Sequence, residues 1–239
     1  MKKIALITGG SRGIGKCLVE GFIKEGYDVA FTYLNSDKDA ENLATRLGAF
    51  EIKADMSSSK DVENAINSVV KKFGQIDVLV NNAGIDEFCL FTDITDEHWH
   101  KMIDTNLSSA FYASRAALRD MIRRQGGVII NIASMWGEVG ASCEVHYSVS
   151  KAGLIGLTKA LAKEVGPSNI RVNCVSPGVI DTDMNKHLSS EDMEQLKNDT
   201  PLGKVGKCED ILNAVLFLAS EKASFITGQI LGVNGGYII

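Results

Sequence analysis

The sequence predicts an α/β fold: a Rossmann-type, doubly wound parallel sheet of seven strands with helices on both faces. Short apolar runs, such as Ile4–Ile7, alternate along the 239 residues with amphipathic stretches of helical period. The first apolar run ends directly in a glycine-rich turn at 8–15, and a helical pattern with Leu18, Val19 and Phe22 follows at once. Continuous apolar runs are typical of parallel strands buried on both faces, and a strand, a glycine turn and a helix in that order are typical of dinucleotide-binding sheets.

The remaining elements follow from the same alternation of patterns. After the strand at 4–7, the apolar runs predict strands at 28–33, 50–53, 76–80, 128–133, 171–176 and 229–233. The helical patterns predict helices at about 36–47, 59–73, 95–124, 146–165 and 209–220. The polar segment Asp183–Thr200 carries a short helix signal and is the best candidate for a mobile substrate lid. No linker or repeat divides the chain, so a single domain over 1–239 is expected.

Composition excludes several classes of function. A hydrophobic content of 45% and a mean hydropathy of +0.03 fit a globular protein with a substantial core. The net charge of -5 gives no basic field, so neither nucleic acid nor an anionic membrane is an expected partner. The apolar run near the N-terminus is too short for a signal peptide, and no run approaches a membrane span. The five scattered cysteines predict reduced thiols in a cytoplasmic protein, with no disulfide framework and no metal site.

The glycine turn predicts a phosphate-binding site. Glycines permit a tight turn and let the backbone approach a phosphate at the N-terminus of the following helix. The spacing here is G-x-x-x-G-x-G, and Thr8 precedes it. The alternative is an ordinary turn between a strand and a helix.

A tyrosine and a lysine four residues apart predict acid-base chemistry. Tyr147 and Lys151 would share one face of the helix at 146–165. A free tyrosine has a pKa of about 10, and an adjacent ammonium group lowers it. Such a tyrosine can donate a proton to a carbonyl oxygen, which a serine hydroxyl such as that of Ser134 would orient and polarise. The alternative is a half-buried tyrosine beside a solvated lysine.

These motifs, taken in order, resemble the short-chain dehydrogenase/reductase family from Lys3 to about Tyr237. The set comprises T-G-x-x-x-G-x-G, N-N-A-G at 81–84, Asn106, Ser134, Y-x-x-x-K at 147–151 and the Pro-Gly pair at 177–178. The runs 200–203 and 228–236 are especially similar to bacterial 3-oxoacyl-acyl carrier protein reductases. A non-catalytic dinucleotide sensor of the same fold is an alternative, against which the intact Ser134, Tyr147 and Lys151 argue.

The resemblance implies that the chain reduces a ketone to a secondary alcohol with hydride from a reduced nicotinamide. Tyr147 would be the general acid and Ser134 would orient the carbonyl group. Lys151 would lower the pKa of the tyrosine and hold the nicotinamide ribose. Asn106 would open the helix at 95–124 and hold a water that links Lys151 to the bulk proton supply.

The resemblance also assigns cofactor contacts to several segments. Asp55 would hold the adenine amine, although a local turn bond is a common alternative for a loop aspartate. The asparagines of N-N-A-G would brace the sheet beside the cofactor. The full set of contacts is Thr8, Gly9, Ser11, Arg12, Gly13, Ile14, Gly15, Asn35, Ser36, Asp55, Met56, Asn82, Ala83, Gly84, Tyr147, Lys151, Pro177, Gly178, Ile180 and Thr182.

The end of the second strand favours NADPH over NADH. An acidic residue usually binds the ribose 2′-hydroxyl of NAD at this point, and residues 31–36 contain none. Arg12 would pair with the 2′-phosphate, and Asn35 and Ser36 would add neutral donors. In the alternative, Arg12 faces solvent, Asp37 binds the ribose and the enzyme prefers NADH.

The loop before Tyr147 leaves the substrate open. The expected pocket residues are Ser134, Trp136, Glu138, Glu144, His146 and Gly178. Fatty-acid reductases usually have a more neutral loop, and the run 136–145 resembles that of elongation factor P 5-aminopentanone reductases, whose substrate carries an amine. Because its branch is broader, the 3-oxoacyl-acyl carrier protein substrate is placed first, with the aminopentanone or another small ketone as the alternative. A solvent-facing position for both glutamates also stays open.

Two partners are expected from the resemblance. An acyl carrier protein would dock on four arginines of one helix, Arg115, Arg119, Arg123 and Arg124, although a charge run is more often a solvated face. A homotetramer would pair through the helices around 96–124 and 147–165 and the last strand. Six apolar residues fit either such an interface or the core: Leu107, Phe111, Leu216, Phe217, Ile230 and Ile238.

Overall fold

The computed structural model describes residues 2–185 and 189–239 and contains one seven-stranded parallel sheet. Its strand order is β3-β2-β1-β4-β5-β6-β7, the doubly wound arrangement that the sequence predicts. The strands are β1 (Ile4–Ile7), β2 (Asp28–Tyr33), β3 (Phe50–Lys53), β4 (Val78–Asn81), β5 (Gly127–Ile132), β6 (Ile170–Pro177) and β7 (Ile230–Val233). Each pair of neighbouring strands is parallel, from Ile4 opposite Asp28 to Pro177 opposite Val233.

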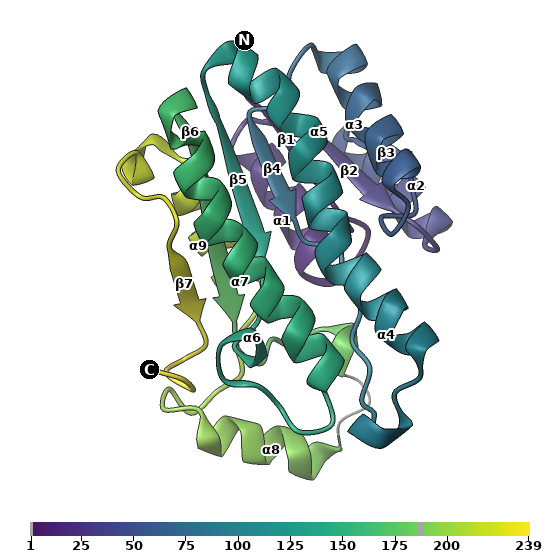
Figure 1. Cartoon of the computed structure of the whole chain (residues 1–239), viewed down its shortest axis with the longest axis vertical. Coiled ribbons are helices and arrows are strands. Elements are labelled where there is room, and N and C mark those ends of the chain that lie inside the picture. The colour runs from purple at the N-terminus through teal and green to yellow at the C-terminus, as the bar shows by residue number, and fades with distance from the viewer. Residues whose placement is uncertain (1, 186–188) are drawn as a thin grey trace.

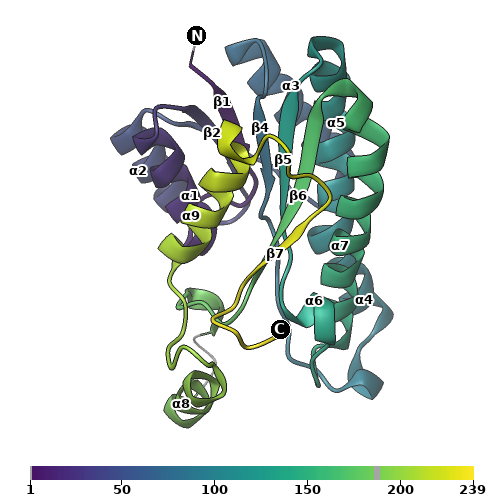
Figure 2. The same ribbon diagram turned by 90° about the vertical axis from the view of Figure 1, so that its left-hand side faces the viewer.

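Helices connect the strands and cover both faces of the sheet (Figure 1). They are α1 (Gly13–Lys24), α2 (Asp37–Leu47), α3 (Ser59–Phe73), α4 (Asp96–Ile103), α5 (Ser109–Arg124), α6 (Trp136–Val139), α7 (Val145–Val165), α8 (Ser190–Asp199) and α9 (Cys208–Ala219). Figure 2 shows α1, α2 and α9 on one side of the sheet, and α3, α5 and α7 on the other.

The two helical layers enclose two separate parts of the core. Ala5 and Ile7 of β1 pack in the cluster that contains Phe22 of α1. Ile4 and Leu6 point the opposite way, into the cluster that contains Met121 of α5. Because successive strand residues alternate between faces, a central strand needs apolar side chains at every position, which is why β1 is continuously apolar.

The carboxyl ends of the strands define one edge of the molecule. In Figure 1 the strand arrows point toward α6 and α8, which lie beyond that edge. The chain leaves β1 for β2 on one side, and returns to β4 on the other side of β1. Ligands of such sheets bind at the carboxyl ends of the strands, near this reversal of strand order. The glycine turn after β1 and the N-N-A-G segment after β4 therefore meet there.

Two helical features differ from the prediction. The long helix expected over 95–124 is interrupted by a π-helical turn at Asp104–Ser108, which separates α4 from α5. Asn106 is buried at the centre of this turn, where the family resemblance predicted an opening. The short helix α6 was not predicted, because four residues carry too little periodicity to indicate a helix.

The expected lid segment Asp183–Thr200 is described in part. A capping box formed by Ser189 and Asp192 begins α8. Each residue of α8 is either exposed or partly covered. Residues 186–188 of the segment lie outside the described residues, so the lid remains a prediction. Within the described ranges, no helix is long and apolar enough to cross a bilayer.

Candidate active site

Three of the predicted catalytic side chains meet at the carboxyl end of β5. Tyr147 and Lys151 lie one turn apart on α7, with the lysine Nζ 5.6 Å from the centre of the tyrosine ring. Ser134, which follows β5, hydrogen-bonds to the tyrosine hydroxyl. All three side chains are buried. The strand places the serine and the helix places the other two, as the sequence predicts.

Asn106 joins this group through the loop that follows β4. Its side chain exchanges two hydrogen bonds with the backbone of Ile85: the Ile85 N–H donates to Oδ1 at 2.8 Å, and Nδ2 donates to the Ile85 carbonyl at 2.9 Å. Nδ2 also lies 3.1 Å from the Ser150 hydroxyl on α7. A π-helical turn exposes backbone and side-chain groups that a regular helix would cover, and such turns are frequent at functional sites.

Lys151 is held in a nearly dry environment. Its side chain is 4% exposed, and Nζ donates a 2.9 Å hydrogen bond to the carbonyl of Ile132. Burial lowers the pKa of this ammonium group to about 8, although Cys174 and Asp86 act in the opposite direction. A Cβ at Gly84 would lie 3.5 Å from Nζ and 3.3 Å from Asn106 Oδ1. The lysine and the asparagine therefore converge on the backbone of the N-N-A-G segment.

The pKa of Tyr147 corrects one expectation from the sequence. Burial raises the pKa of this phenol well above its usual value, Asp86 and Glu144 raise it further, and the hydrogen bond from Ser134 lowers it. The expected lowering of this pKa is not met in this structure, because burial of the phenol is the largest effect. The phenol is consequently protonated at neutral pH, which is the form that a proton donor requires.

The glycine turn and the N-N-A-G segment are bonded together. The Thr8 hydroxyl accepts hydrogen bonds from the backbone N–H groups of Asn82 and Ala83, both at 2.9 Å. The Asn82 side chain donates to the carbonyls of Thr8 and Gly9 at 2.9 and 3.1 Å. These bonds fix the two segments that the sequence assigns to the cofactor against one another.

Glycine is required at two positions of the turn. Gly9 has a φ of +66°, and a Cβ there would lie 2.9 Å from the Ala83 Cα. A Cβ at Gly15 would lie 2.0 Å from the Gly9 carbonyl oxygen. Backbone packed this closely leaves the N-terminus of α1 open to a phosphate, so these residues fit a dinucleotide.

The asparagines of N-N-A-G brace the sheet as the resemblance implied. Asn81 Nδ2 donates to Asn131 Oδ1 on β5 at 2.8 Å and to the Ser114 hydroxyl on α5 at 3.1 Å. Asn131 Nδ2 in turn donates to the Thr158 hydroxyl on α7 at 2.8 Å. The chain of bonds links two central strands to the helix that carries Tyr147.

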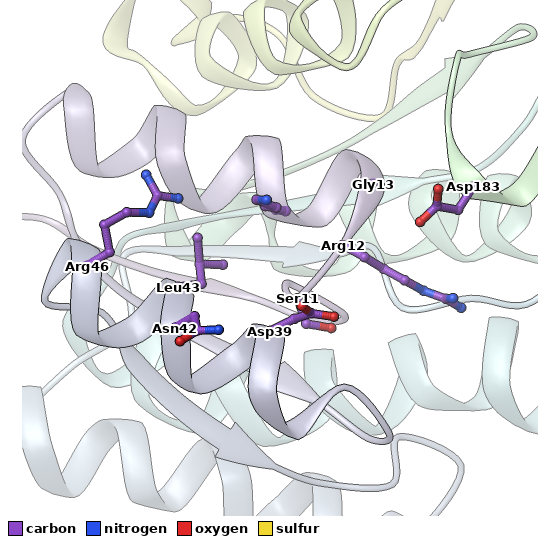
Figure 3. Close-up of a pocket in the computed structure, with 9 residues that line it drawn as sticks. Ser11, Arg12, Gly13, Asp39, Asn42, Leu43, Arg46 and Asp183 are labelled. Carbon is purple, nitrogen blue, oxygen red and sulfur yellow. The ribbon is translucent and has the colours of Figure 1, made fainter.

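A hollow of about 430 Å³ lies between α1 and α2 beside the glycine turn (Figure 3). In the figure, Arg46 lies at one end of it, while the exposed side chain of Arg12 extends at the other end, on the side of Asp183. Ser11, Gly13, Lys16, Asp39, Asn42 and Leu43 complete the lining. Of the cations that line the hollow, Arg12 and Lys16 lie at or next to the glycine turn, whereas Arg46 is farther away. The hollow can therefore accept an anionic group beside the adenosine position.

The end of β2 agrees with the predicted absence of an acid. The strand ends at Tyr33, while Asn35 and Ser36 lie between it and α2. Asp37, the alternative ribose ligand, is the first residue of α2 and pairs with Lys53 at 2.7 Å. Its carboxylate is therefore already engaged by a cation of β3.

Other predicted cofactor residues occupy varied positions. Asp55 makes the local turn bonds that were the alternative, because its Oδ1 accepts from the Ser57 N–H and hydroxyl at 2.9 and 2.7 Å. Met56 and Ile180 point into the core, so only their backbones are available to a ligand. Ile14 also packs against the core. The remaining residues border the glycine turn or β7: Thr182 near Gly13, Pro177 at the end of β6 and Gly178 against Asn234.

Two of the predicted pocket residues flank Tyr147. Glu144 is the residue before α7, and burial, with a smaller contribution from Asp86, raises the pKa of its carboxyl to about 7. His146 is fully buried, and its Nε2 lies 3.4 Å from Glu87 Oε2. Trp136 lies edge-on to Tyr237, with ring centres 5.6 Å apart, and its backbone N–H donates to the Ser134 hydroxyl.

Glu138 does not join the pocket, which corrects its predicted role. Its carboxylate accepts a 2.5 Å hydrogen bond from Ser176. It lines a different hollow, together with Lys159 of α7 and Gln229 before β7. The turn of α6 points position 138 to the outside of the α7 and β7 pair, so this carboxylate is exposed there.

One functional candidate, Asp86, was missed by sequence reasoning. It lies between Ile85, bonded to Asn106, and Glu87, which neighbours His146. Its charge influences the pKa values of Tyr147, Lys151 and Glu144 alike. The available signal was its position two residues beyond N-N-A-G, at the carboxyl edge of β4. No group of side chains suited to holding a metal ion occurs among residues 2–185 and 189–239.

Known proteins match nearly the whole chain. A family model described as "Enoyl-(Acyl carrier protein) reductase" matches residues 9–238. The 3-oxoacyl-[acyl-carrier-protein] reductase FabG of Staphylococcus aureus is 43% identical over 241 residues, which cover 99% of this chain and 98% of that protein. The protein of the same name from Chlamydia muridarum is 42% identical over 241 residues, covering 99% and 97%. The solved structure of a Serratia marcescens short-chain dehydrogenase/reductase double mutant is similar with a TM-score of 0.92 and 38% identity, covering 98% of this chain and 97% of that one.

Proposed function

The chain belongs to the short-chain dehydrogenase/reductase family, and on that premise we propose that it is an NADPH-dependent reductase of a ketone. The observation that carries the proposal is the burial of Ser134, Tyr147 and Lys151 together at the carboxyl end of β5, with Lys151 next to Gly84 of the N-N-A-G segment. A sensor that only binds a dinucleotide would not need a protonated phenol bonded to a serine at this place.

Tyr147 is the proton donor in this proposal. Its raised pKa keeps the phenol protonated at neutral pH, and the reduced nicotinamide supplies the hydride to the carbonyl carbon. The Ser134 hydroxyl lies at the same oxygen and orients the ketone. Lys151 would hold the nicotinamide ribose and, with a pKa of about 8, can pass a proton toward the tyrosine. Asn106 would hold the water that resupplies the lysine.

The segments at the carboxyl ends of β1 and β4 would hold the cofactor. The turn at 8–15 would bind the pyrophosphate, the backbone of 82–84 would contact the ribose, and the segment 177–182 would contact the nicotinamide. Arg12 would bind the 2′-phosphate of NADPH. The pairing of Asp37 with Lys53 supports this choice, because it removes the carboxylate that would bind an unphosphorylated ribose.

Sequence identity supports a 3-oxoacyl-[acyl-carrier-protein] as the substrate. The FabG proteins of that name match this chain over almost its full length at 43% and 42% identity. The product would be the 3-hydroxyacyl form, in fatty acid biosynthesis, and the partner would be the carrier protein in the cytoplasm. The predicted docking arginines do not support it: Arg119 pairs with Glu63, and Arg124 pairs with Asp120 and Asp77.

The pocket itself favours the second candidate, a ketone that carries an amine, such as the 5-aminopentanone group on elongation factor P. Asp86 and Glu144 place two carboxyl groups near the phenol of Tyr147, and each raises its pKa. Burial, and then repulsion from Asp86, raises the pKa of Glu144 to about 7, and an ammonium group between the two acids would relieve that repulsion. A neutral acyl chain would gain nothing from these acids.

One assay distinguishes these possibilities. NADPH oxidation is followed with a 3-oxoacyl thioester and with an amino-ketone of similar length, using wild type and Tyr147→Phe. We expect turnover by the wild type only, with a higher kcat/KM for the amino-ketone. A higher kcat/KM for the thioester would instead favour the 3-oxoacyl-[acyl-carrier-protein] as the substrate. Equal turnover by wild type and variant would refute the role of the tyrosine, and NADPH binding without turnover would indicate a sensor.

We also propose a homotetramer as the active form. Phe111 on α5 and Phe217 on α9 are 44% and 41% exposed, which leaves apolar surface on two different helices. Leu107, Leu216 and Ile230 are instead packed against the core, so they contribute less than the sequence suggested. Light scattering at assay concentration tests this assembly, and a monomer would refute it.

A further inference from the structure

Two loops lie side by side next to the ketone pocket. The loop 85–93 follows β4 and its neighbouring N-N-A-G segment, and the loop 140–144 leads into α7. The backbone N–H of Cys89 donates a 2.7 Å hydrogen bond to the carbonyl oxygen of Cys143. The first loop carries Asp86, and Glu144 directly follows Cys143 in the second. The positions of both acidic side chains of the pocket therefore depend on the positions of these two loops.

The backbone bond places the two cysteines within reach of one another. With standard bond lengths and angles, a 2.7 Å N–H···O bond limits the distance between the two Cα atoms to about 6.6 Å. Disulfides join Cα atoms about 4.4–6.8 Å apart. Both thiols are only half-buried, and Cys143 has a φ of 61°, in a turn outside regular structure. Small movements of the loops can therefore bring the sulfurs together.

We propose that Cys89 and Cys143 are a thiol modification site, at which a peroxide-class oxidant forms a reversible disulfide between the two pocket loops. One thiol loses its proton, and the thiolate attacks a peroxide oxygen, breaks the O–O bond and becomes a sulfenic acid; the hydroxide that leaves takes up the proton as water. The second thiol also ionises, its thiolate attacks the sulfenic sulfur, the S–S bond forms as the S–O bond breaks, and the second hydroxide takes up a proton and leaves as water. In total two thiols lose two hydrogens, and one hydrogen peroxide is reduced to two waters. A dithiol such as dithiothreitol returns the two thiols.

The other cysteines are poorly suited to this chemistry. Burial raises the pKa of Cys174 and of Cys17 to about 12, so few thiolates form at either position near neutral pH. Burial, with Glu87 and Asp93, also raises the pKa of Cys89, but this thiol is more accessible than that of the buried Cys174. The disulfide should accordingly form faster as the pH rises. Cys17 and Cys208 provide a second neighbouring pair, which serves as an internal control.

The test uses the full-length protein and needs no substrate, so it is independent of the proposed function. Reduced protein is treated with hydrogen peroxide, the remaining thiols are alkylated, and intact mass and peptide maps are recorded. We expect the loss of two hydrogens and a linked peptide pair that contains residues 89 and 143, both reversed by dithiothreitol. Hydrogen exchange of amides 85–93 should slow on oxidation and recover on reduction.

Single variants make the result decisive. Cys143→Ser and Cys89→Ser should abolish the linked pair, while the matched control Cys208→Ser should retain it in full. A link between Cys17 and Cys208 in its place would overturn the proposal. So would oxidation that stops at sulfinic acid on either loop, or an unchanged exchange rate of the 85–93 amides in fully oxidised protein.

Discussion

Asn106 and Ile85 exchange two hydrogen bonds, of 2.8 and 2.9 Å, between the side chain of a π-helical turn and the backbone of the loop after β4. The π-helical turn frees the side chain of Asn106. The loop that this side chain holds follows the N-N-A-G segment and carries Asp86. Through this pair, the interruption between α4 and α5 fixes one wall of the site.

Replacing Asn106 with alanine should therefore lower both stability and turnover. It leaves a backbone N–H and a carbonyl of Ile85 unsatisfied in a partly buried place, which costs about 1–3 kcal/mol of unfolding free energy. We expect kcat to fall more than tenfold, because the loop beside Lys151 loses its anchor. Ser108→Ala is the matched control, since Ser108 belongs to the same turn but its hydroxyl donates to Asp104 within that turn and not to the loop after β4. Denaturant unfolding and NADPH turnover measure the two effects. Equal unfolding free energies and equal kcat values for the two variants would contradict the anchoring role of Asn106.

The cofactor preference depends on Arg12. Arg12→Ala should reduce kcat/KM for NADPH about 10- to 100-fold, the value of one lost charge-assisted bond, and leave kcat/KM for NADH almost unchanged. Arg46→Ala is the matched control, because Arg46 lines the same hollow but pairs with Glu20. If the wild type prefers NADH, or if Arg46→Ala has the larger effect on NADPH, the assignment of the 2′-phosphate to Arg12 fails.

The acids of the pocket should act on the charge of the substrate. We expect Asp86→Asn and Glu144→Gln each to raise KM for an amino-ketone about tenfold and to change KM for a neutral ketone little. Glu138→Gln should have no effect on either, because Glu138 bonds to Ser176 in a separate hollow. Equal changes for charged and neutral ketones would mean that the two acids do not contact the amine.

Glu144 should also give stability a distinct pH dependence. Its pKa in the folded protein is about 7, above the ordinary value of 4.5, because burial and Asp86 disfavour the carboxylate. Its contribution is fully present below pH 4.5 and is lost as the pH rises through 7. After allowance for its partial exposure, we expect wild type to lose about 1 kcal/mol relative to Glu144→Gln over this range. Denaturant unfolding at several pH values measures the difference, and parallel curves would exclude the shift.

The sequence predicts most of the framework because the framework depends on local patterns. The strand at 50–53 and the helix at 59–73 have the predicted bounds, since a β-type run and a capped amphipathic run each carry their own period. Ser134, Tyr147 and Lys151 come together because a strand end and one helical turn fix them. These relationships require no knowledge of distant contacts.

Predictions that depend on tertiary environment fared worse. The pKa of Tyr147 is raised and not lowered, because burial of the phenol and the nearby acids outweigh the hydrogen bond from Ser134. Glu138 was predicted to line the ketone pocket, but its carboxylate accepts a hydrogen bond from Ser176 instead. Its side-chain direction is set by the short helix α6, which the sequence did not predict. Asp86 escaped notice because nothing in its own segment has a period, and its neighbours in the site lie on α7 and on the π-helical turn.

The arginines at the end of α5 give the last prediction, which separates structure from docking. Arg124 donates to Asp120 at 2.7 Å, to Asp77 and to the Ile76 carbonyl, at the amino end of β4 and away from the carboxyl edge. Burial alone would raise the pKa of Asp120, but the bonds from Arg124 and Arg123 lower it. Arg124→Ala should therefore cost about 3 kcal/mol of unfolding free energy, as the loss of one partner of a buried pair does.

Arg123 is the matched control, because it pairs with the same carboxylate but is 73% exposed, against 25% for Arg124. Arg123→Ala should cost less than about 1 kcal/mol. Neither variant should change the ratio of turnover with a carrier-linked thioester to turnover with the free thioester, since both arginines serve the helix. A selective loss with the carrier-linked substrate, at full stability, would restore this surface as the docking site of an acidic carrier protein.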